Sequence, residues 1–185
     1  MAHPERKRNR LSGYDYSSEG LYFVTSCVQD RVHAFGEVVE GEMRLNRFGL
    51  IAEQQWYWLH ERYPNVVLHE FVVMPNHIHG IIQLDNSTTS TPLSEKGPVP
   101  PGAIGRPEHG LTTLTSPGSK PKSISGIMGA YKTTSSKLIR QAGMPEFAWQ
   151  RSFHDHIIRN NIAYNNIADY ILNNPSLWHK DKFHI

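Results

Sequence analysis

The sequence contains one cysteine and no long apolar run, and each absence excludes a class of protein. Cys27 cannot form an internal disulfide, and without a CxxC pair a zinc site built from thiolates is excluded. No stretch approaches the roughly 20 apolar residues of a membrane-spanning helix. The basic start, residues 1–10, is not followed by the apolar segment of a secretory signal. We therefore expect a cytoplasmic protein, nucleoid-associated if bacterial, without a membrane partner.

Charge is also modest, and a net charge of +2 is by itself weak evidence for a nucleic-acid partner. The 185 residues, of which 38% are hydrophobic, fit one domain over 1–185. Residues 85–122 are crowded with Ser, Thr, Pro and Gly and have neither helix nor strand period. We interpret them as a flexible insertion within that domain. A tether over a ligand and a neutral loop are both open for it.

Strand-like and helix-like segments alternate through the rest of the chain. Strands are expected at 21–28, 66–74, 77–84 and within 146–158, with a shorter β segment near 37–44 that turns at Gly41. Helices are expected within 46–63, 123–143 and 159–174. The order β-α-β-β-α-β matches the ferredoxin-like split βαβ core. The predicted class is therefore α+β, with an antiparallel sheet and an added C-terminal helix.

Each expected helix has a predicted buried stripe. The stripes are Leu50, Ile51, Gln55, Trp58 and Leu59 in the first helix, Ile124, Ile127, Tyr131 and Leu138 in the second, and Ile162, Ile167 and Ile171 in the third.

Two histidines interrupt the apolar run VVMPNHIHGII, residues 72–82. Side chains alternate along a strand, so His77 and His79 point to one face and both can reach one divalent cation. A bare HxH is more often a pair of hydrogen-bonded structural histidines, and that alternative stays open here. If a cation binds, a further oxygen ligand is expected, because Mg²⁺ prefers oxygen and Mn²⁺ accepts imidazole and oxygen together.

The last expected helix carries Tyr170 and Asn174 four residues apart, on one helical face. An amide oxygen can ligate a cation, and a tyrosine hydroxyl can act as a covalent nucleophile. On spacing alone, a packing tyrosine and a capping asparagine are the more common interpretation. Tyr164, on the same helix, is the second choice of nucleophile, and Tyr131 is expected to pack in the core.

Three blocks in this order, FVVMPNHIHGIIQL, FAWQRSFHDHIIRN and IADYILNNPSLW, closely resemble the REP-associated tyrosine transposases. These belong to the single-tyrosine HUH transposase superfamily, named for a His–hydrophobic–His motif that residues 77–79 match. The resemblance covers most of the chain outside 85–122. It implies a ferredoxin-like core and a metal-dependent endonuclease and strand transferase. Such an enzyme cuts single-stranded DNA at hairpin-forming repeats through a 5′-phosphotyrosine.

The resemblance also implies roles for individual residues. Tyr170 becomes the catalytic nucleophile, and His77, His79 and Asn174 become ligands of a divalent metal, Mg or Mn. His156 matches a recurrent family histidine and is expected to support the ligands or to contact DNA. Monomer and homodimer are both open, as are a catalytically inactive, domesticated DNA-binding protein of the same fold and a replication initiator or relaxase-type HUH nuclease.

Basic and aromatic side chains supply a predicted surface for single-stranded or hairpin DNA. The predicted contacts are Lys132, Lys137, Arg140, Arg151, Arg159 and Trp149, the last with core packing as an equal alternative.

Overall fold

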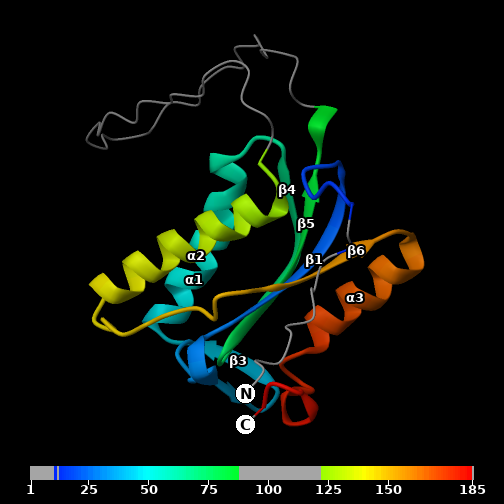
Figure 1. Cartoon of the computed structure of the whole chain (residues 1–185). Coiled ribbons are helices and arrows are strands. Elements are labelled where there is room, and N and C mark those ends of the chain that lie inside the picture. Colours follow the sequence, from blue (N-terminus) through cyan, green and yellow to red (C-terminus); the bar gives the residue numbers. More distant parts are fainter. Residues whose placement is uncertain (1–10, 12, 88–121, 185) are drawn as a thin grey trace, which may run out of the picture.

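A four-stranded antiparallel sheet lies at the centre of the computed structural model, which describes residues 11, 13–87 and 122–184 (Figure 1). Its strand order is β4 (Val66–Met74), β5 (His77–Leu84), β1 (Gly20–Cys27) and β6 (His154–Ile158). The crossovers from β1 to β4 and from β5 to β6 each leave one strand between their ends, which is the split βαβ arrangement. The predicted α+β ferredoxin-like core is therefore confirmed. Most of the predicted 85–122 insertion, residues 88–121, lies outside the described residues.

The short β segment near 37–44 forms a separate hairpin of β2 (Gly36–Val39) and β3 (Glu42–Leu45). Glu40 and Gly41 connect the strands with φ of 54° and 81°, as a type I′ turn requires, so the predicted turn at Gly41 is confirmed. The predicted strand within 146–158 is shorter than expected. Only β6 pairs continuously with β1, and an isolated bridge joins Val28 to Trp149 before it.

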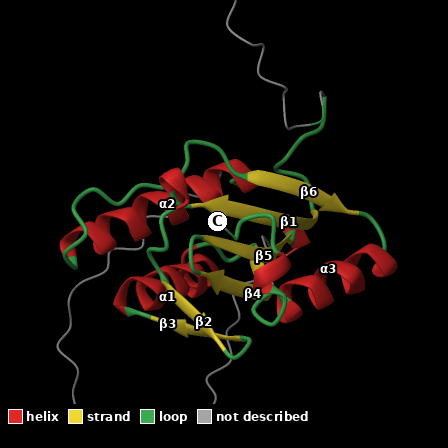
Figure 2. Cartoon of the chain, turned by 90° about the horizontal axis from the view of Figure 1, so that it is seen from below, coloured by secondary structure: helices red, strands yellow, loops and turns green. Residues whose placement is uncertain are grey.

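Helices α1 (Arg47–Arg62) and α2 (Ile124–Gln141) cover one face of the sheet, and α3 (Asn161–Asn173) covers the other (Figures 1 and 2). An asparagine or serine side chain caps the start of each helix. Asn46, Ser123 and Asn160 accept hydrogen bonds from backbone N–H groups of their first turns. Among the described residues, no helix is both long enough and apolar enough to cross a membrane.

The buried face of α1 differs from the predicted stripe. Leu59 is buried as expected, but Leu50 is 48% exposed, and the buried face is formed by Phe48, Ala52, Trp56 and Leu59. These residues follow the helical spacing as closely as the predicted ones, and Trp56 decides between the two sets. Its ring stacks on Phe71 of β4 with centroids 4.3 Å apart.

In each of the other two helices, one residue that was predicted to be buried is exposed. In α2, Leu138 is 37% exposed and Ile139 is buried in its place. In α3, Ile171 is fully buried but Ile162 is 76% exposed. Ala168, which was not part of the predicted stripe, is buried at the contact with the sheet beside Ile171, and Ile167 packs there partly buried.

Side chains of strand β5 pack on both faces of the sheet. Ile78 and Ile82 point into the core beneath α1 and α2, while Ile81 points towards α3. Gly80 shares the first face, where a Cβ atom would lie 2.4 Å from the ring of Trp56. The absence of a side chain at position 80 therefore lets the largest core residue lie directly on the strand that carries the histidines.

We expect Gly80→Ala to destabilise the protein by about 1–3 kcal/mol, because the methyl group overpacks the contact with Trp56. Gly129→Ala is the matched control. Nothing lies within 4 Å of a Cβ atom at this position in α2, so alanine should stabilise the helix by about 0.5–1 kcal/mol. Chemical denaturation of both variants measures the difference. Equal effects would contradict the packing described for Trp56.

Candidate functional site

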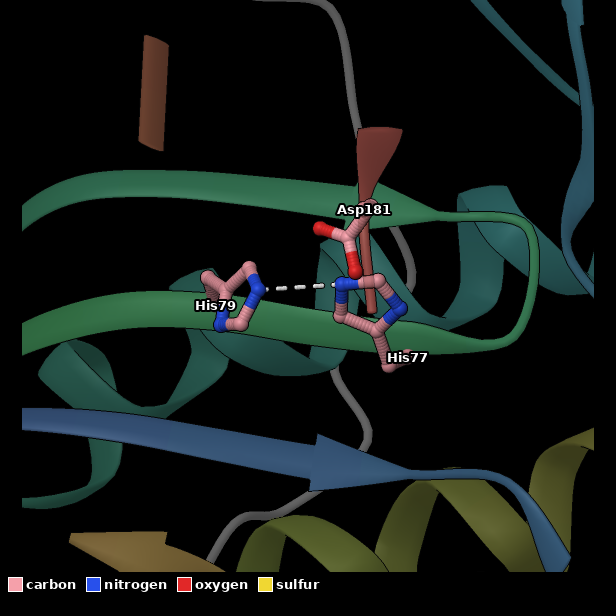
Figure 3. Close-up of side chains that lie close together, drawn as sticks. All are labelled: His77, His79 and Asp181. Atoms are coloured by element: carbon pink, nitrogen blue, oxygen red, sulfur yellow. Dashed lines mark hydrogen bonds between the residues drawn. The ribbon is translucent and has the colours of Figure 1, made fainter. Parts of the chain in front are cut away.

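His77 and His79 lie side by side on the α3 face of β5, and both side chains are buried (Figure 3). Their Nε2 atoms are 3.0 Å apart. The alternation of a strand explains the shared face, since Ile78 between them points into the opposite core. Two ring nitrogens that converge at this distance share one hydrogen or one cation.

Asn76 fixes the protonation of the His77 ring. Its Nδ2 donates to the carbonyl oxygens of Phe183, at 2.9 Å, and Arg31, at 3.3 Å, so its Oδ1 must be the atom that faces His77. The distance from that oxygen to Nδ1 of His77 is 2.8 Å. Because an amide oxygen only accepts, Nδ1 carries the hydrogen. In the neutral ring, the Nε2 lone pair of His77 is then directed towards His79 and is available to a cation.

Thr25 holds the second ring from the neighbouring strand. It is the register partner of His79 in the β1–β5 pair, and its Oγ1 lies 2.7 Å from Nδ1 of His79. The two histidine rings are therefore supported by Asn76 and Thr25. Support of the ligands was one of the two roles predicted for His156. His156 is instead exposed on β6, opposite Phe23 of β1.

Burial keeps both histidines uncharged. It lowers the pKa of His77 to about 3, and the positive charges of Arg31 and Lys182 act in the same direction. Burial also lowers the pKa of His79 well below its usual value, followed by the effect of His77. Two neutral imidazoles are the form in which histidine binds a metal ion.

An acidic residue that the sequence reasoning missed completes the cluster. Ligand atoms of His77, His79 and Asp181 all lie within 4.8 Å of one another, so the three residues could hold a metal ion (Figure 3). Asp181 belongs to the segment after α3. Its Oδ1 accepts the backbone N–H of Phe183 at 2.7 Å, and its Oδ2 accepts Nδ2 of Asn174 at 3.0 Å.

The amide oxygen of Asn174 also supports a cation near this cluster. The residue is 2% exposed, and its Oδ1 is buried without a hydrogen-bond partner. A buried amide oxygen without a partner is costly, and a cation would satisfy it. The two imidazoles and the carboxylate form a mixed nitrogen and oxygen set that suits a divalent cation such as Mn²⁺, and the amide of Asn174 is bonded to that carboxylate.

Tyr170 is the tyrosine that the fold brings to this cluster. Its hydroxyl lies 3.1 Å from Nε2 of His79 and 3.4 Å from Oδ2 of Asp181, and the residue is 38% exposed. Burial raises the pKa of Tyr170 to about 12, and the charge of Asp181 adds to the increase. The phenol is therefore protonated at neutral pH.

The two other tyrosines considered as nucleophiles, Tyr164 and Tyr131, point elsewhere. A bulge in β4 between Leu68 and Phe71 lets adjacent residues His69 and Glu70 both reach Tyr164. The Tyr164 hydroxyl donates to Glu70 at 2.8 Å and lies 3.1 Å from Nδ1 of His69. Tyr131 is fully buried, as expected, and its hydroxyl donates to the carbonyl of Ala52.

The segment after α3 is anchored by two aromatic residues. Trp178 and Phe183 are buried against Cys27 and Met74, and the Phe183 ring lies 4.5 Å from that of His77. The short 3-10 helix η3 (Trp178–Lys180) and the turn after it hold Asp181 between these anchors. The sequence here has no periodicity, so only the aromatic residues on either side of Lys-Asp-Lys could have suggested an ordered loop.

Two of the residues predicted to contact DNA, Trp149 and Lys132, instead make contacts within the protein. Trp149 is 8% exposed within the core, and its Nε1 donates to Ser135, so its ring is not available to stack on a base. The ammonium group of Lys132 donates to the carbonyls of Gln150 and Ser152 at 2.8 and 3.0 Å. Burial lowers its pKa to about 8. Both residues stabilise the connection between α2 and β6.

The remaining predicted contacts are exposed. Arg140 donates to the carbonyl of Phe147 through Nε, and Lys137, Arg151 and Arg159 lie at the surface. Lys137 and Arg140 belong to α2, on the face of the sheet opposite to the histidine pair. Their contact with DNA stays a prediction.

The neutral histidine pair predicts how stability depends on pH in the presence of a chelator. Below an unfolded-state pKa of about 6.5, the unfolded chain binds protons that the folded chain does not, so the free energy of unfolding falls as the pH falls. Each histidine contributes up to about 1.4 kcal/mol per pH unit between pH 6 and 4. Denaturation across this range should show a shallower slope in His77→Gln/His79→Gln. An unchanged slope would contradict burial of the neutral pair.

Asn76→Ala should weaken Mn²⁺ binding by about 10–100-fold, because the His77 ring loses the acceptor that fixes its tautomer. Isothermal titration with Mn²⁺ measures the effect. Asn165→Ala, which removes an exposed amide from α3, is the control and should bind like the original chain. Equal affinities of the two variants would show that Asn76 does not prepare the ring for a cation.

Comparisons with known proteins agree with this fold. No family model matches the chain. An uncharacterised protein of Haemophilus influenzae is 33% identical over 183 residues, which cover 97% of this chain and 93% of that protein. The structure of a REP-associated tyrosine transposase bound to a REP hairpin matches with a TM-score of 0.54 and 21% identity, covering 91% of this chain and 74% of that one.

The resemblance stated from three sequence blocks is thus supported by an independent comparison of folds, over nearly the whole chain. The chain belongs to the same family as the Haemophilus influenzae protein and has the fold of the REP-associated tyrosine transposases.

Proposed function

We propose that the protein is a metal-dependent endonuclease and strand transferase that cuts single-stranded DNA beside hairpin-forming repeats. One observation carries the proposal: the Tyr170 hydroxyl lies 3.1 Å from Nε2 of His79, within a cluster of metal-ligating side chains. A tyrosine hydroxyl beside a cation site provides the nucleophile and the positive charge for attack on a DNA phosphodiester. The solved relative of the same fold holds a REP hairpin, which supports hairpin DNA as the partner.

His77, His79 and Asp181 would hold the cation, and the free amide oxygen of Asn174 makes it the fourth candidate ligand. The mixed donor set favours Mn²⁺ and admits Mg²⁺. Bound there, the cation would supply positive charge to offset the negative charge that develops on the phosphate oxygens.

Tyr170 supplies the covalent chemistry. Its hydroxyl oxygen forms a bond to phosphorus while the bond from phosphorus to the 3′ oxygen breaks, and the leaving oxygen takes up a proton to become a 3′-OH. The products are a 5′-phosphotyrosine and a free 3′ end. Since the phosphodiester is retained in the link to the protein, attack by another 3′-OH rejoins strands without ATP.

The proton of the phenol must leave during this attack. Asp181 Oδ2, at 3.4 Å, is the carboxylate oxygen within reach of the hydroxyl, and we assign the proton to it. In the protein alone the pKa of Tyr170 is raised to about 12, so the phenol is a weak acid and remains protonated at neutral pH. Added positive charge near the oxygen lowers that pKa, which explains why the proposed activity depends on a cation.

We expect a covalent adduct when the protein is incubated with Mn²⁺ and a 3′-labelled hairpin oligonucleotide carrying a single-stranded flank. Label should migrate with the protein in a denaturing gel, because the 5′-phosphotyrosine remains on the 3′ fragment. Repeats flanking the gene supply the oligonucleotide sequence. Tyr170→Phe and chelator should each abolish the adduct.

Tyr164→Phe is the matched control, since it removes the other hydroxyl of the same helix and should leave the adduct intact. An adduct that survives in Tyr170→Phe would refute the assigned nucleophile. Binding of the oligonucleotide without an adduct, with either metal, would instead identify a DNA-binding protein of the same fold without catalytic activity.

A further inference from the structure

A pocket of about 450 Å³ opens beside the histidine pair and is lined in part by Tyr170, Phe23, Lys180 and Lys182. Only Tyr170 among these four has a place in the proposed chemistry. The other three come from the central strand β1 and from the segment after α3. The pocket therefore combines an aromatic ring and two cations next to the assigned nucleophile.

Lys180 and Lys182 form a cationic wall on either side of Asp181. The buried anchors Trp178 and Phe183 fix the loop that carries them. Both lysines are exposed, and in the part of the chain that the structure describes neither ammonium group makes a hydrogen bond or an ion pair, although that of Lys182 lies 4.8 Å from the centre of the Phe183 ring. With neutral histidines and one carboxylate, the two lysines leave the pocket positively charged, which favours a phosphate group.

Phe23 is an aromatic wall of the same pocket. Its ring stacks on His79 at 5.4 Å and meets Tyr170 edge-on at 6.3 Å, yet the residue is only half-buried. His156, its register partner on β6, is exposed on the same face. A partly exposed aromatic ring within a cationic pocket suits a flat base attached to a phosphate.

The position of the other cations strengthens this assignment. Lys137 and Arg140 lie on α2, across the sheet from Tyr170, and the ammonium of Lys132 is occupied by two backbone carbonyls. Lys180 and Lys182 are instead the lysines that line the pocket together with Tyr170.

We propose that this pocket binds one unpaired nucleotide of the DNA substrate, with Lys180 and Lys182 holding its phosphates and Phe23 stacking on its base. The assignment rests on the proposed function for the identity of the substrate. It requires an unpaired base, because a base within a duplex has no free face for Phe23.

Binding without metal tests the pocket separately from cleavage. The probes are a short fluorescent thymidine oligonucleotide and an abasic oligonucleotide of the same length, titrated in chelator against a Tyr170→Phe protein. Lys180→Ala/Lys182→Ala should weaken binding of both probes at least about tenfold. The slope of log affinity against log salt should become shallower by about 1.4, or about 0.7 for each phosphate contact.

Arg47→Ala/Arg62→Ala is the charge-matched control, since both residues are exposed on α1, across the sheet. Its effect should be small. Equal losses in the two double variants would mean that only the net charge matters, and would overturn the phosphate assignment.

Phe23→Leu tests the stacking and keeps an apolar side chain against α3. It should weaken the thymidine oligonucleotide about fivefold or more and leave the abasic one unchanged, while Phe23→Tyr should bind like the parent. An equal effect of Phe23→Leu on both probes would overturn the base assignment. If these differences appear but no covalent adduct forms, the pocket stands and the proposed cleavage fails. If a covalent adduct forms but these differences do not appear, the proposed cleavage stands and the pocket assignment fails.

Discussion

The site depends on the pairing register of β5. A slip of one residue would turn His77 and His79 into the core beneath α1 and α2, and would expose Ile78 and Ile82 on the other face. Two contacts fix the register from opposite sides of the sheet: Gly80 lies under Trp56, and Thr25 of β1 bonds to His79. The packing of the core and the alignment of the histidines are thus one constraint.

Most elements of the fold follow from the sequence, because strands, caps and turns are set by local residues such as Asn46 and Gly41. The buried faces of the helices do not, since α1 has apolar side chains around most of its circumference. Trp56 is buried because a neighbouring strand offers it Gly80 and Phe71, and this is a tertiary match that no period reveals. Helical spacing likewise does not reveal that Ile162 lies outside the contact between α3 and the sheet and is exposed.

Some residues of the candidate site could likewise be predicted from the sequence, and others could not. Strand alternation and helical spacing, with the family resemblance, identified four residues that the structure brings together: His77, His79, Tyr170 and, through its hydrogen bond to Asp181, Asn174. Asp181 and the two lysines beside it were missed, because their positions depend on where buried Trp178 and Phe183 attach the end of the chain. Residue type alone also left open whether Trp149 stacks on a base or packs, and the structure places its ring in the core. Nothing in its neighbouring sequence distinguishes a stacking tryptophan from a packed one.

The central claim is that the two rings and the phenol meet at one cation. Anomalous diffraction from crystals grown with Mn²⁺ tests it most directly. The account predicts one strong peak within coordination distance of Nε2 of both His77 and His79, adjacent to the Tyr170 hydroxyl. No peak at the histidine pair, with the two rings still hydrogen-bonded to each other in the presence of Mn²⁺, would contradict it.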